Sequence, residues 1–140
     1  MSDGYPIGSV MLIDDSEIDQ MISKRLIERS GMVGQFIGFL SAEAALEHLK
    51  NTDLPAVDAI LLDVKMPRMD GWEFLEAATS ELGESFARIV VMMLTTSLDP
   101  RDQERAQQFS VVKDYCNKPL LQDYLERLAV ILNEDAPGAA

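Results

Sequence analysis

Polar side chains follow the apolar runs of this 140-residue chain, at the point where each run ends. Asp14 and Asp15 follow the run 10–13, and Asp63 follows the uninterrupted run 59–62. An apolar run of this kind is typical of a strand covered on both faces, as in parallel α/β sheets. Ligands of such sheets bind outside the carboxyl ends of the strands, so Asp63 is a candidate site residue. The alternative is a solvated aspartate that begins a turn.

Two later runs end in the same way. Thr95 follows the longest apolar run, 89–94, and Lys118 and Pro119 follow the mixed run 111–117. If the runs are parallel strands of one sheet, their carboxyl ends lie at one rim. The acids, the threonine and the lysine would then meet there, although each alone could be a turn residue or a solvated charge.

The chemistry of this set is specific. Three carboxylates in a small space repel one another, so we expect Asp14, Asp15 and Asp63 to hold a hard cation. Mg²⁺ binds oxygen ligands and keeps several waters, which leaves room for a phosphoryl oxygen. Lys118 would bring a positive charge to the phosphoryl group, and the Thr95 hydroxyl would donate a hydrogen bond to it. The set therefore predicts that Asp63 is a nucleophile in phosphoryl transfer.

Helical patterns alternate with the strands and must position these residues. Capping residues and apolar spacing predict five helices, at about 17–30, 42–50, 71–82, 101–109 and 121–132. The remaining expected strand covers 35–40. Alternating strands and helices predict an α/β fold, a doubly wound five-stranded parallel sheet of order 2-1-3-4-5. The helix 101–109 has the thinnest apolar face, with Ala106 and Phe109 as its anchors.

Composition limits the classes of function. The formal net charge of −12 argues against a general nucleic-acid surface and suits a cation site. Hydrophobic residues make up 47% of the chain, but no run approaches the ~20 residues of a membrane span. Residues 1–10 do not have the pattern of a signal peptide, so we expect a cytoplasmic protein without a membrane partner.

Taken together, the motifs resemble those of the receiver domains of two-component response regulators, the CheY-like proteins. The resemblance covers about residues 8–132 and includes the loop after Asp63. It rests on the following segments: Asp14-Asp15, Asp63, Met66-Pro67-Arg68-Met69-Asp70-Gly71, Thr95-Thr96 and Lys118-Pro119.

The resemblance implies roles at the cation site. Asp63 would accept a phosphoryl group from a phosphohistidine on a sensor histidine kinase or a histidine phosphotransfer protein. Asp15 and Asp63 would bind Mg²⁺ through their side chains, Asp14 through water, and Lys65 through its backbone carbonyl. The protein would catalyse only its own phosphoryl transfer and dephosphorylation, and would otherwise not be an enzyme.

Further roles concern the switch. The resemblance implies that Lys118 and Thr95 contact the phosphoryl group, and that Tyr115 moves inward when Thr95 moves. It also implies a cis peptide bond before Pro119. Lys65 and Ser97, each two residues after a motif residue, are expected to tune the lifetime of the acyl phosphate.

The expected output surface consists of the helix 101–109, the strand 111–117 and the helix 121–132. We expect a receiver domain at 1–133, a short flexible tail at 134–140, and no DNA-binding domain. Such a protein could bind a target, shuttle phosphoryl groups or drain them from a kinase. The alternatives are an interaction module that needs no phosphorylation, and a flavodoxin-like cofactor binder, for whose phosphate the acidic rim is unsuited.

Overall fold

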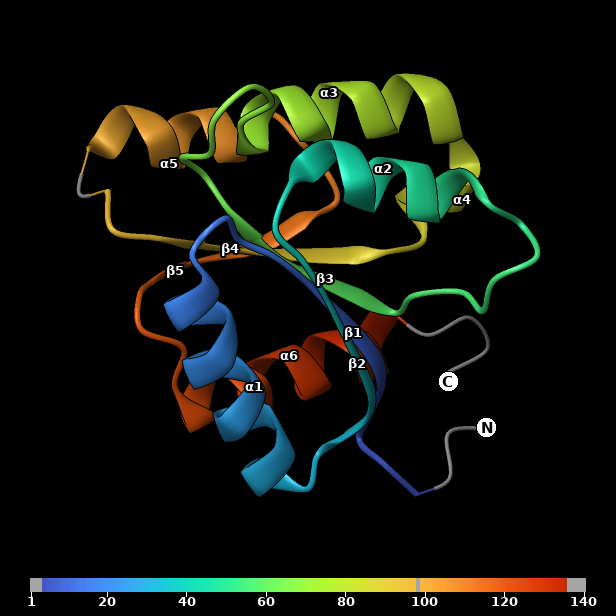
Figure 1. Ribbon diagram of the computed structural model, residues 1–140, viewed down its shortest axis with the longest axis vertical. Helices are drawn as coiled ribbons and strands as arrows, with labels where there is room; N and C mark the ends of the chain where they lie inside the picture. The colour runs from blue at the N-terminus through green and yellow to red at the C-terminus, as the bar shows by residue number, and fades with distance from the viewer. Residues whose placement is uncertain (1–3, 98, 136–140) are drawn as a thin grey trace.

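Five apolar segments pair as the strands of one parallel sheet in the computed structural model, which describes residues 4–97 and 99–135 (Figure 1). Their order is β2-β1-β3-β4-β5, as the sequence predicts. The strands are β1 (Ile7–Ile13), β2 (Val33–Phe39), β3 (Ala59–Asp63), β4 (Val90–Thr95) and β5 (Val112–Asn117).

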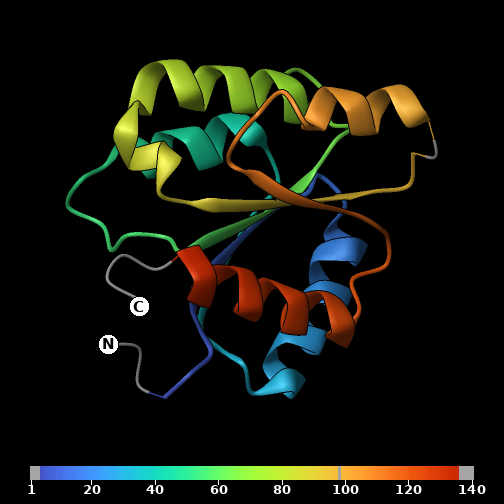
Figure 2. The same cartoon turned by 180° about the vertical axis from the view of Figure 1, so that it is seen from behind.

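Helices cover both faces of the sheet, as the apolar character of its central strands requires. One face carries α2 (Ala42–Lys50), α3 (Gly71–Leu82), α4 (Glu84–Ala87) and α5 (Pro100–Ala106), and the other carries α1 (Glu17–Ser30) and α6 (Gln122–Asp135) (Figures 1 and 2). Alternate strand residues enter the two cores: Met11 and Leu62 lie on the first face, and Leu12 and Leu61 on the second.

The structure differs from the predicted helices in two places. It has a short additional helix, α4, whose Phe86 is buried and packs edge-on against Phe74. Four residues are too few to display a helical period, so the sequence pattern does not predict this helix. The helix predicted at 101–109 is α5, which ends at Ala106, and the Phe109 ring lies beyond it against Trp72 with ring centroids 6.3 Å apart.

The end of the chain extends the last predicted helix. α6 continues through Asp135, beyond the predicted limit at 132. Of the tail predicted at 134–140, the first two residues belong to this helix, and residues 136–140 lie outside the described residues. Along the described residues, no helix combines the length and the apolar character that crossing a bilayer would require.

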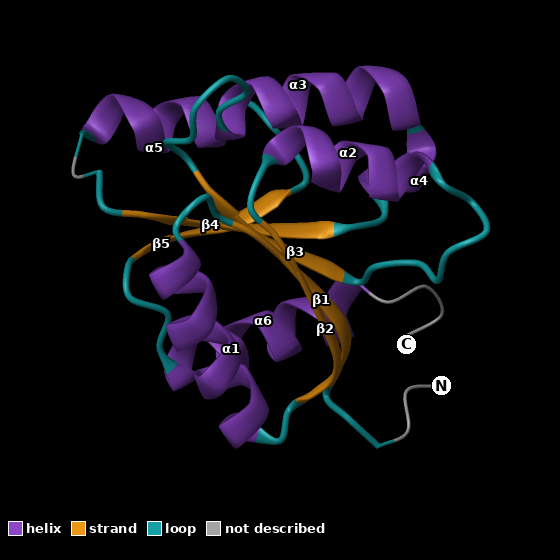
Figure 3. Ribbon diagram, viewed as in Figure 1, coloured by secondary structure: helices purple, strands orange, loops and turns teal. Residues whose placement is uncertain are grey.

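Strand register brings the carboxyl ends of the central strands level with one another. Ile13 pairs with Leu62, Asp63 with Leu94, and Thr95 with Asn117. The loops that leave β1, β3, β4 and β5 therefore lie at one edge of the sheet (Figure 3). The pairing of backbone groups along the strands therefore brings the polar residues that follow them to the same edge.

A glycine allows α3 to begin close to this edge. The Gly71 amide donates a hydrogen bond to the Val64 carbonyl at 2.8 Å, and a Cβ atom at Gly71 would lie 2.6 Å from the carbonyl oxygen of Asp63. Asp70 caps the helix in a reciprocal arrangement with Glu73. The backbone that carries Asp63 is thus held against the start of a capped helix.

Candidate functional site

Three carboxylates converge at the edge of the sheet. Asp14 and Asp15 follow β1 and Asp63 ends β3, and the three offer oxygen atoms that all lie within 4.8 Å of one another. Asp14 and Asp63 are buried, and Asp15 is exposed. The structure thus brings together the acids that the sequence predicts, with an open side toward solvent at Asp15.

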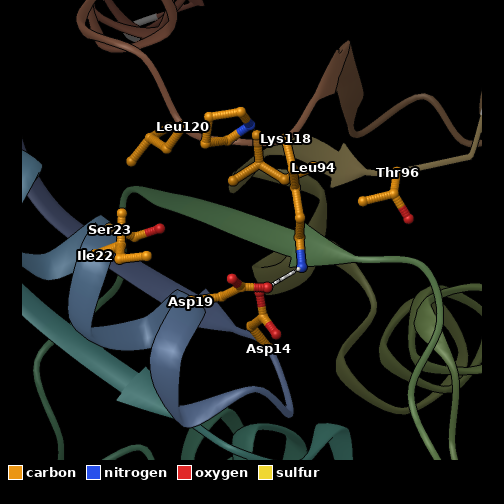
Figure 4. A pocket seen from close by; sticks show the side chains of 9 residues that line it. Asp14, Asp19, Ile22, Ser23, Leu94, Thr96, Lys118 and Leu120 are labelled. Carbon is orange, nitrogen blue, oxygen red and sulfur yellow. Dashed lines mark hydrogen bonds and ion pairs between the residues drawn. The ribbon is translucent and has the colours of Figure 1, made fainter.

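The ammonium group of Lys118 lies among acidic side chains. Its Nζ atom is 2.7 Å from Asp14 Oδ2 and 3.0 Å from Asp19 Oδ2 (Figure 4). It is also 3.3 Å from Asp63 Oδ2. Burial by itself lowers the pKa of Lys118, but the hydrogen bonds to Asp14 and Asp19 and the charge of Asp63 outweigh it, so the pKa is raised. Lys118 is therefore a permanent positive charge at this rim.

Asp63 is a perturbed acid. Its pKa is raised to about 6, and burial is the largest cause. The positive charge of Lys118 acts in the opposite direction, and the negative charges of Asp14 and Asp15 add to the rise. A buried carboxylate with a raised pKa beside a charged partner is a frequent property of functional sites.

The acidic triad has the chemistry of a cation site typical of receiver domains. Its donors are carboxylate oxygens, which suit a hard divalent cation such as Mg²⁺. After burial, which is the main cause, the negative charges of Asp14 and Asp15 contribute to the raised pKa of Asp63, and a cation would relieve that repulsion. The residues present therefore fit the ion that the sequence predicts.

Thr95 and Ser97 link the rim to α5. Thr95 is buried at the end of β4, and its Oγ1 atom accepts a hydrogen bond from the Ser97 amide at 2.9 Å. The Ser97 hydroxyl donates to Asp102 Oδ2 in the first turn of α5 at 2.6 Å. A chain of two hydrogen bonds thus runs from the strand end to the helix.

Tyr115 and Lys65 flank this link. The Tyr115 hydroxyl is buried and makes no hydrogen bond of good geometry to a described residue. Burial and the charge of Asp102 raise the Tyr115 pKa, while the nearby Thr95 and Ser97 side chains oppose the rise. Lys65 is exposed, and its charge adds to the hydrogen bonds of Arg101 that lower the pKa of Asp99. Both side chains therefore lie toward the loop between β4 and α5.

The loop after β5 completes the rim. The peptide bond between Lys118 and Pro119 is cis, as the resemblance implies, and the Lys118 amide donates to the Thr95 carbonyl at 2.9 Å. A groove of about 290 Å³ lies beside the Lys118 side chain, between α1 and the loop that leads to α6 (Figure 4). The hydrogen bond therefore holds the lysine that follows β5 next to the threonine that ends β4.

Sequence reasoning missed two residues of α1. By its type and place, Asp19 is an acid suited to the first turn of a helix, but in the structure it contacts Lys118 at 3.0 Å. The Gln20 side-chain amide donates to three backbone carbonyls at the ends of β1 and β2, those of Leu12, Asp14 and Phe39. The position of both residues in the turn directly after Asp14 and Asp15 was the available signal.

Comparison with known proteins identifies the family. Residues 10–129 match the family model of the response regulator receiver domain. The chain belongs to the response regulator receiver domain family. Receiver domains are signalling modules of two-component systems and not classical enzymes, and membership implies a histidine kinase as partner.

Relatives of this receiver domain agree with that assignment. The probable methanogenesis regulatory protein FilR2 of Methanothrix harundinacea is 31% identical over 130 residues, which cover 89% of this chain and 81% of that protein. The two-component response regulator ORR1 of Oryza sativa subsp. japonica is 31% identical over 135 residues, covering 91% of this chain and 56% of that protein. The receiver domain therefore spans little more than half of the rice protein.

The fold agrees as well. The crystal structure of a two component response regulator from Cytophaga hutchinsonii superimposes with a TM-score of 0.83 at 30% sequence identity. The match covers 91% of this chain and 98% of that one. The structural similarity therefore extends over nearly the whole chain.

Asp63→Asn is expected to stabilise the metal-free receiver domain above about pH 6. The folded-state pKa of Asp63, about 6, exceeds its ordinary 3.8, so ionised Asp63 opposes folding. This cost is fully present above the folded pKa, shrinks as the pH falls through it, and is absent below the unfolded value. At about 1.4 kcal/mol for each pKa unit, the gain at pH 7.5 should be about 1–3 kcal/mol.

Urea unfolding in a chelator, at pH 7.5 and at pH 4.5, measures this gain. Asp53→Asn, which changes an exposed acid in the loop before β3, is the matched control and should show no gain at either pH. A gain for Asp63→Asn that is equal at the two pH values would contradict the assigned cause.

Proposed function

We propose that this receiver domain is a phosphoacceptor whose Asp63 takes a phosphoryl group from a phosphohistidine on a histidine kinase or histidine phosphotransfer protein. The observation that carries the proposal is the surroundings of Asp63. Its carboxylate is 10% exposed, lies within a triad of acids that fits Mg²⁺, and is 3.3 Å from the Lys118 ammonium. A nucleophilic oxygen, a cation site and a fixed positive charge are the elements that phosphoryl transfer needs.

Each residue has a defined part in the proposed transfer. An Asp63 carboxylate oxygen forms a bond to phosphorus while the bond between phosphorus and the donor imidazole nitrogen breaks, and the imidazole leaves. Asp15 and Asp63 would hold Mg²⁺ through their side chains, Asp14 through water and Lys65 through its backbone carbonyl, and the bound ion would neutralise charge on the phosphoryl oxygens. Lys118 pairs with a phosphoryl oxygen, and the Thr95 hydroxyl, which accepts from Ser97, has a proton left to donate.

A small phosphodonor such as acetyl phosphate should label the wild-type protein on Asp63 when Mg²⁺ is present. Intact-mass spectrometry should show the addition of one phosphoryl group, which a chelator abolishes. Asp63→Asn should remove the label because no carboxylate nucleophile remains, and Asp15→Asn should raise the Mg²⁺ concentration needed. Asp53→Asn, an exposed acid away from the rim, should label as wild type does. Full labelling of Asp63→Asn would refute Asp63 as the acceptor.

We further propose that Lys65 and Ser97 tune the lifetime of the acyl phosphate. Lys65 has a long side chain on the open side of the rim, where it can pair with phosphoryl charge and obstruct an in-line water. The Ser97 amide donates to Thr95 and the Ser97 hydroxyl donates to Asp102. The position of the Ser97 side chain therefore depends on that of Thr95, which would contact the phosphoryl group.

Lys65→Ala is expected to shorten the lifetime of the acyl phosphate because the in-line approach of water is opened. The measurement is the decay of phosphorylated protein after the donor is removed, at saturating Mg²⁺. Lys113→Ala, which removes an exposed lysine of β5, is the control for the loss of one positive charge. An unchanged decay rate in Lys65→Ala would remove Lys65 from this role.

The proposed output surface consists of α5, β5 and α6. Among the residues of α5 only Ala106 is buried, so this helix has the thinnest apolar anchor available to a switch. Its first turn is tied to Thr95 through the Ser97–Asp102 hydrogen bond at 2.6 Å. A phosphoryl group that accepts a hydrogen bond from the Thr95 hydroxyl would alter this connection between Thr95 and α5. The Tyr115 side chain can then move beside it. A shift from about 1:99 to 99:1 requires roughly 5.5 kcal/mol of differential affinity between the two states.

Addition of Mg²⁺ and beryllofluoride, a phosphoryl mimic, should change amide hydrogen exchange in residues 99–117. The expected cause is altered anchoring of α5 when Thr95 turns toward the mimic. Helix α2, on the other side of α3, serves as the internal reference and should keep its protection. Asp63→Asn with the same additions is the control without a ligand for beryllium. Changes confined to the loops next to Asp63 would overturn this route.

A further inference from the structure

The Lys118 side chain is held by a carboxylate that belongs to no part of the acidic triad. Asp19 Oδ2 lies 3.0 Å from Lys118 Nζ, closer than Asp63 Oδ2 at 3.3 Å. Lys118 is 15% exposed and Asp19 is 41% exposed, so the pair lies at the open margin of the rim. Figure 4 shows the lysine extended from the end of β5 toward Asp14 and Asp19. The ammonium group is thus drawn toward α1.

The first turn of α1 holds Asp19 in a fixed place. The Asp19 amide donates to the capping hydroxyl of Ser16 at 3.1 Å, and the Ser16 amide donates to Asp14 Oδ1 at 2.9 Å. The next residue, Gln20, donates its side-chain amide to carbonyls at the ends of β1 and β2, including that of Phe39 at 2.8 Å. A helix turn anchored at both of these points presents the Asp19 carboxylate from a rigid element.

A phosphoryl group on Asp63 would need the donors that Asp19 now occupies. An ammonium group has three N–H donors, and in the structure Lys118 donates to Asp14 and Asp19 and forms an ion pair with Asp63 at 3.3 Å. A cation held by the triad would satisfy Asp14 and Asp63, and Asp19 would remain the anion that competes with the phosphoryl oxygens for Lys118. Its charge also repels a phosphoryl dianion in the same place.

We propose that Asp19 is a positioning residue that holds Lys118 toward α1 and thereby weakens the grip of the site on a phosphoryl group. Asp19 is not one of the three acids of the triad and acts through the lysine. This inference rests on the proposed phosphoacceptor function and assigns to the same site a residue that limits its occupancy.

Asp19→Asn is expected to bind beryllofluoride about two- to fivefold more tightly than wild type, the effect of losing one partly exposed charge pair. Isothermal titration calorimetry at saturating Mg²⁺ measures the affinity. The backbone amide of residue 19 still donates to Ser16 in this variant, so the helix cap is kept. Asp19→Ser, which also removes the carboxylate, should give the same direction and serves as the second variant.

Glu17→Gln is the matched control. Glu17 lies in the same turn of α1 and is exposed. Its substitution removes the same unit of negative charge as Asp19→Asn, but from a side chain that does not pair with Lys118. The excess affinity of Asp19→Asn should also shrink when the salt concentration rises toward 1 M, because screening weakens the pull that Asp19 exerts in the wild type. A role limited to holding the helix in place would produce no such salt dependence.

The outcomes separate the two proposals. Wild-type protein that does not bind beryllofluoride with Mg²⁺ would overturn the phosphoacceptor function and this inference together. Wild-type binding with Asp19→Asn equal to Glu17→Gln, or weaker than wild type, would overturn the role of Asp19 and leave the function intact. Tighter binding of beryllofluoride by Asp19→Asn and Asp19→Ser but not by Glu17→Gln, with an excess affinity that disappears in high salt, would support the role of Asp19.

Discussion

The buried negative charge at the edge of the sheet is the constraint on which the rest of the site depends. Asp14 and Asp63 are 2% and 7% exposed, and a carboxylate removed from water this far needs a positive partner. Lys118 is that partner in the structure, at 2.7 Å and 3.3 Å from the two acids. Because one lysine serves several anions, any cation or phosphoryl group that enters the rim must redistribute its contacts. Binding of a ligand at the rim therefore changes the contacts of Lys118.

Rigid elements hold these charges in spite of their repulsion. Gly71 lets α3 begin against the backbone of Asp63, and the Gln20 side chain ties the first turn of α1 to the ends of β1 and β2. The Lys118 amide bonds to the Thr95 carbonyl, which fixes the start of the lysine side chain relative to β4. Functional geometry supported by hydrogen bonds to the backbone is better defined than geometry that rests on side chains alone.

The elements around the rim contribute more buried side chains to the core than α5 does. The sheet and α3 supply fully buried side chains such as Leu62 and Phe74, whereas α5 contributes only Ala106 to the core. Arg105 of the same helix lies over the ring of the buried Trp72 at 5.0 Å, but its own side chain is about half exposed. Small changes at the Thr95 end can shift such an element at low cost because few buried contacts oppose them.

The sequence alone determined the architecture and most of the acidic rim. Uninterrupted apolar runs such as 59–62 are typical of strands buried on both faces, and their alternation with helical patterns predicts a parallel sheet whose strand ends share one edge. That reasoning correctly placed Asp14, Asp15, Asp63, Thr95 and Lys118 together. The roles of Lys65, Ser97 and Tyr115 stay proposals, because a role in transfer or switching is not a property of position.

Tertiary structure decided what short-range patterns cannot express. Helix α4 is too short to have a period, and α5 ends at Ala106, so that Phe109 packs against Trp72 from outside the helix. The contact of Asp19 with Lys118 joins residues that are 99 positions apart. In the sequence Asp19 is one acid among several at the start of a helix. Only the crossing of α1 past the end of β5 makes it a neighbour of the lysine, because the contact arises from the arrangement of the two elements on the sheet.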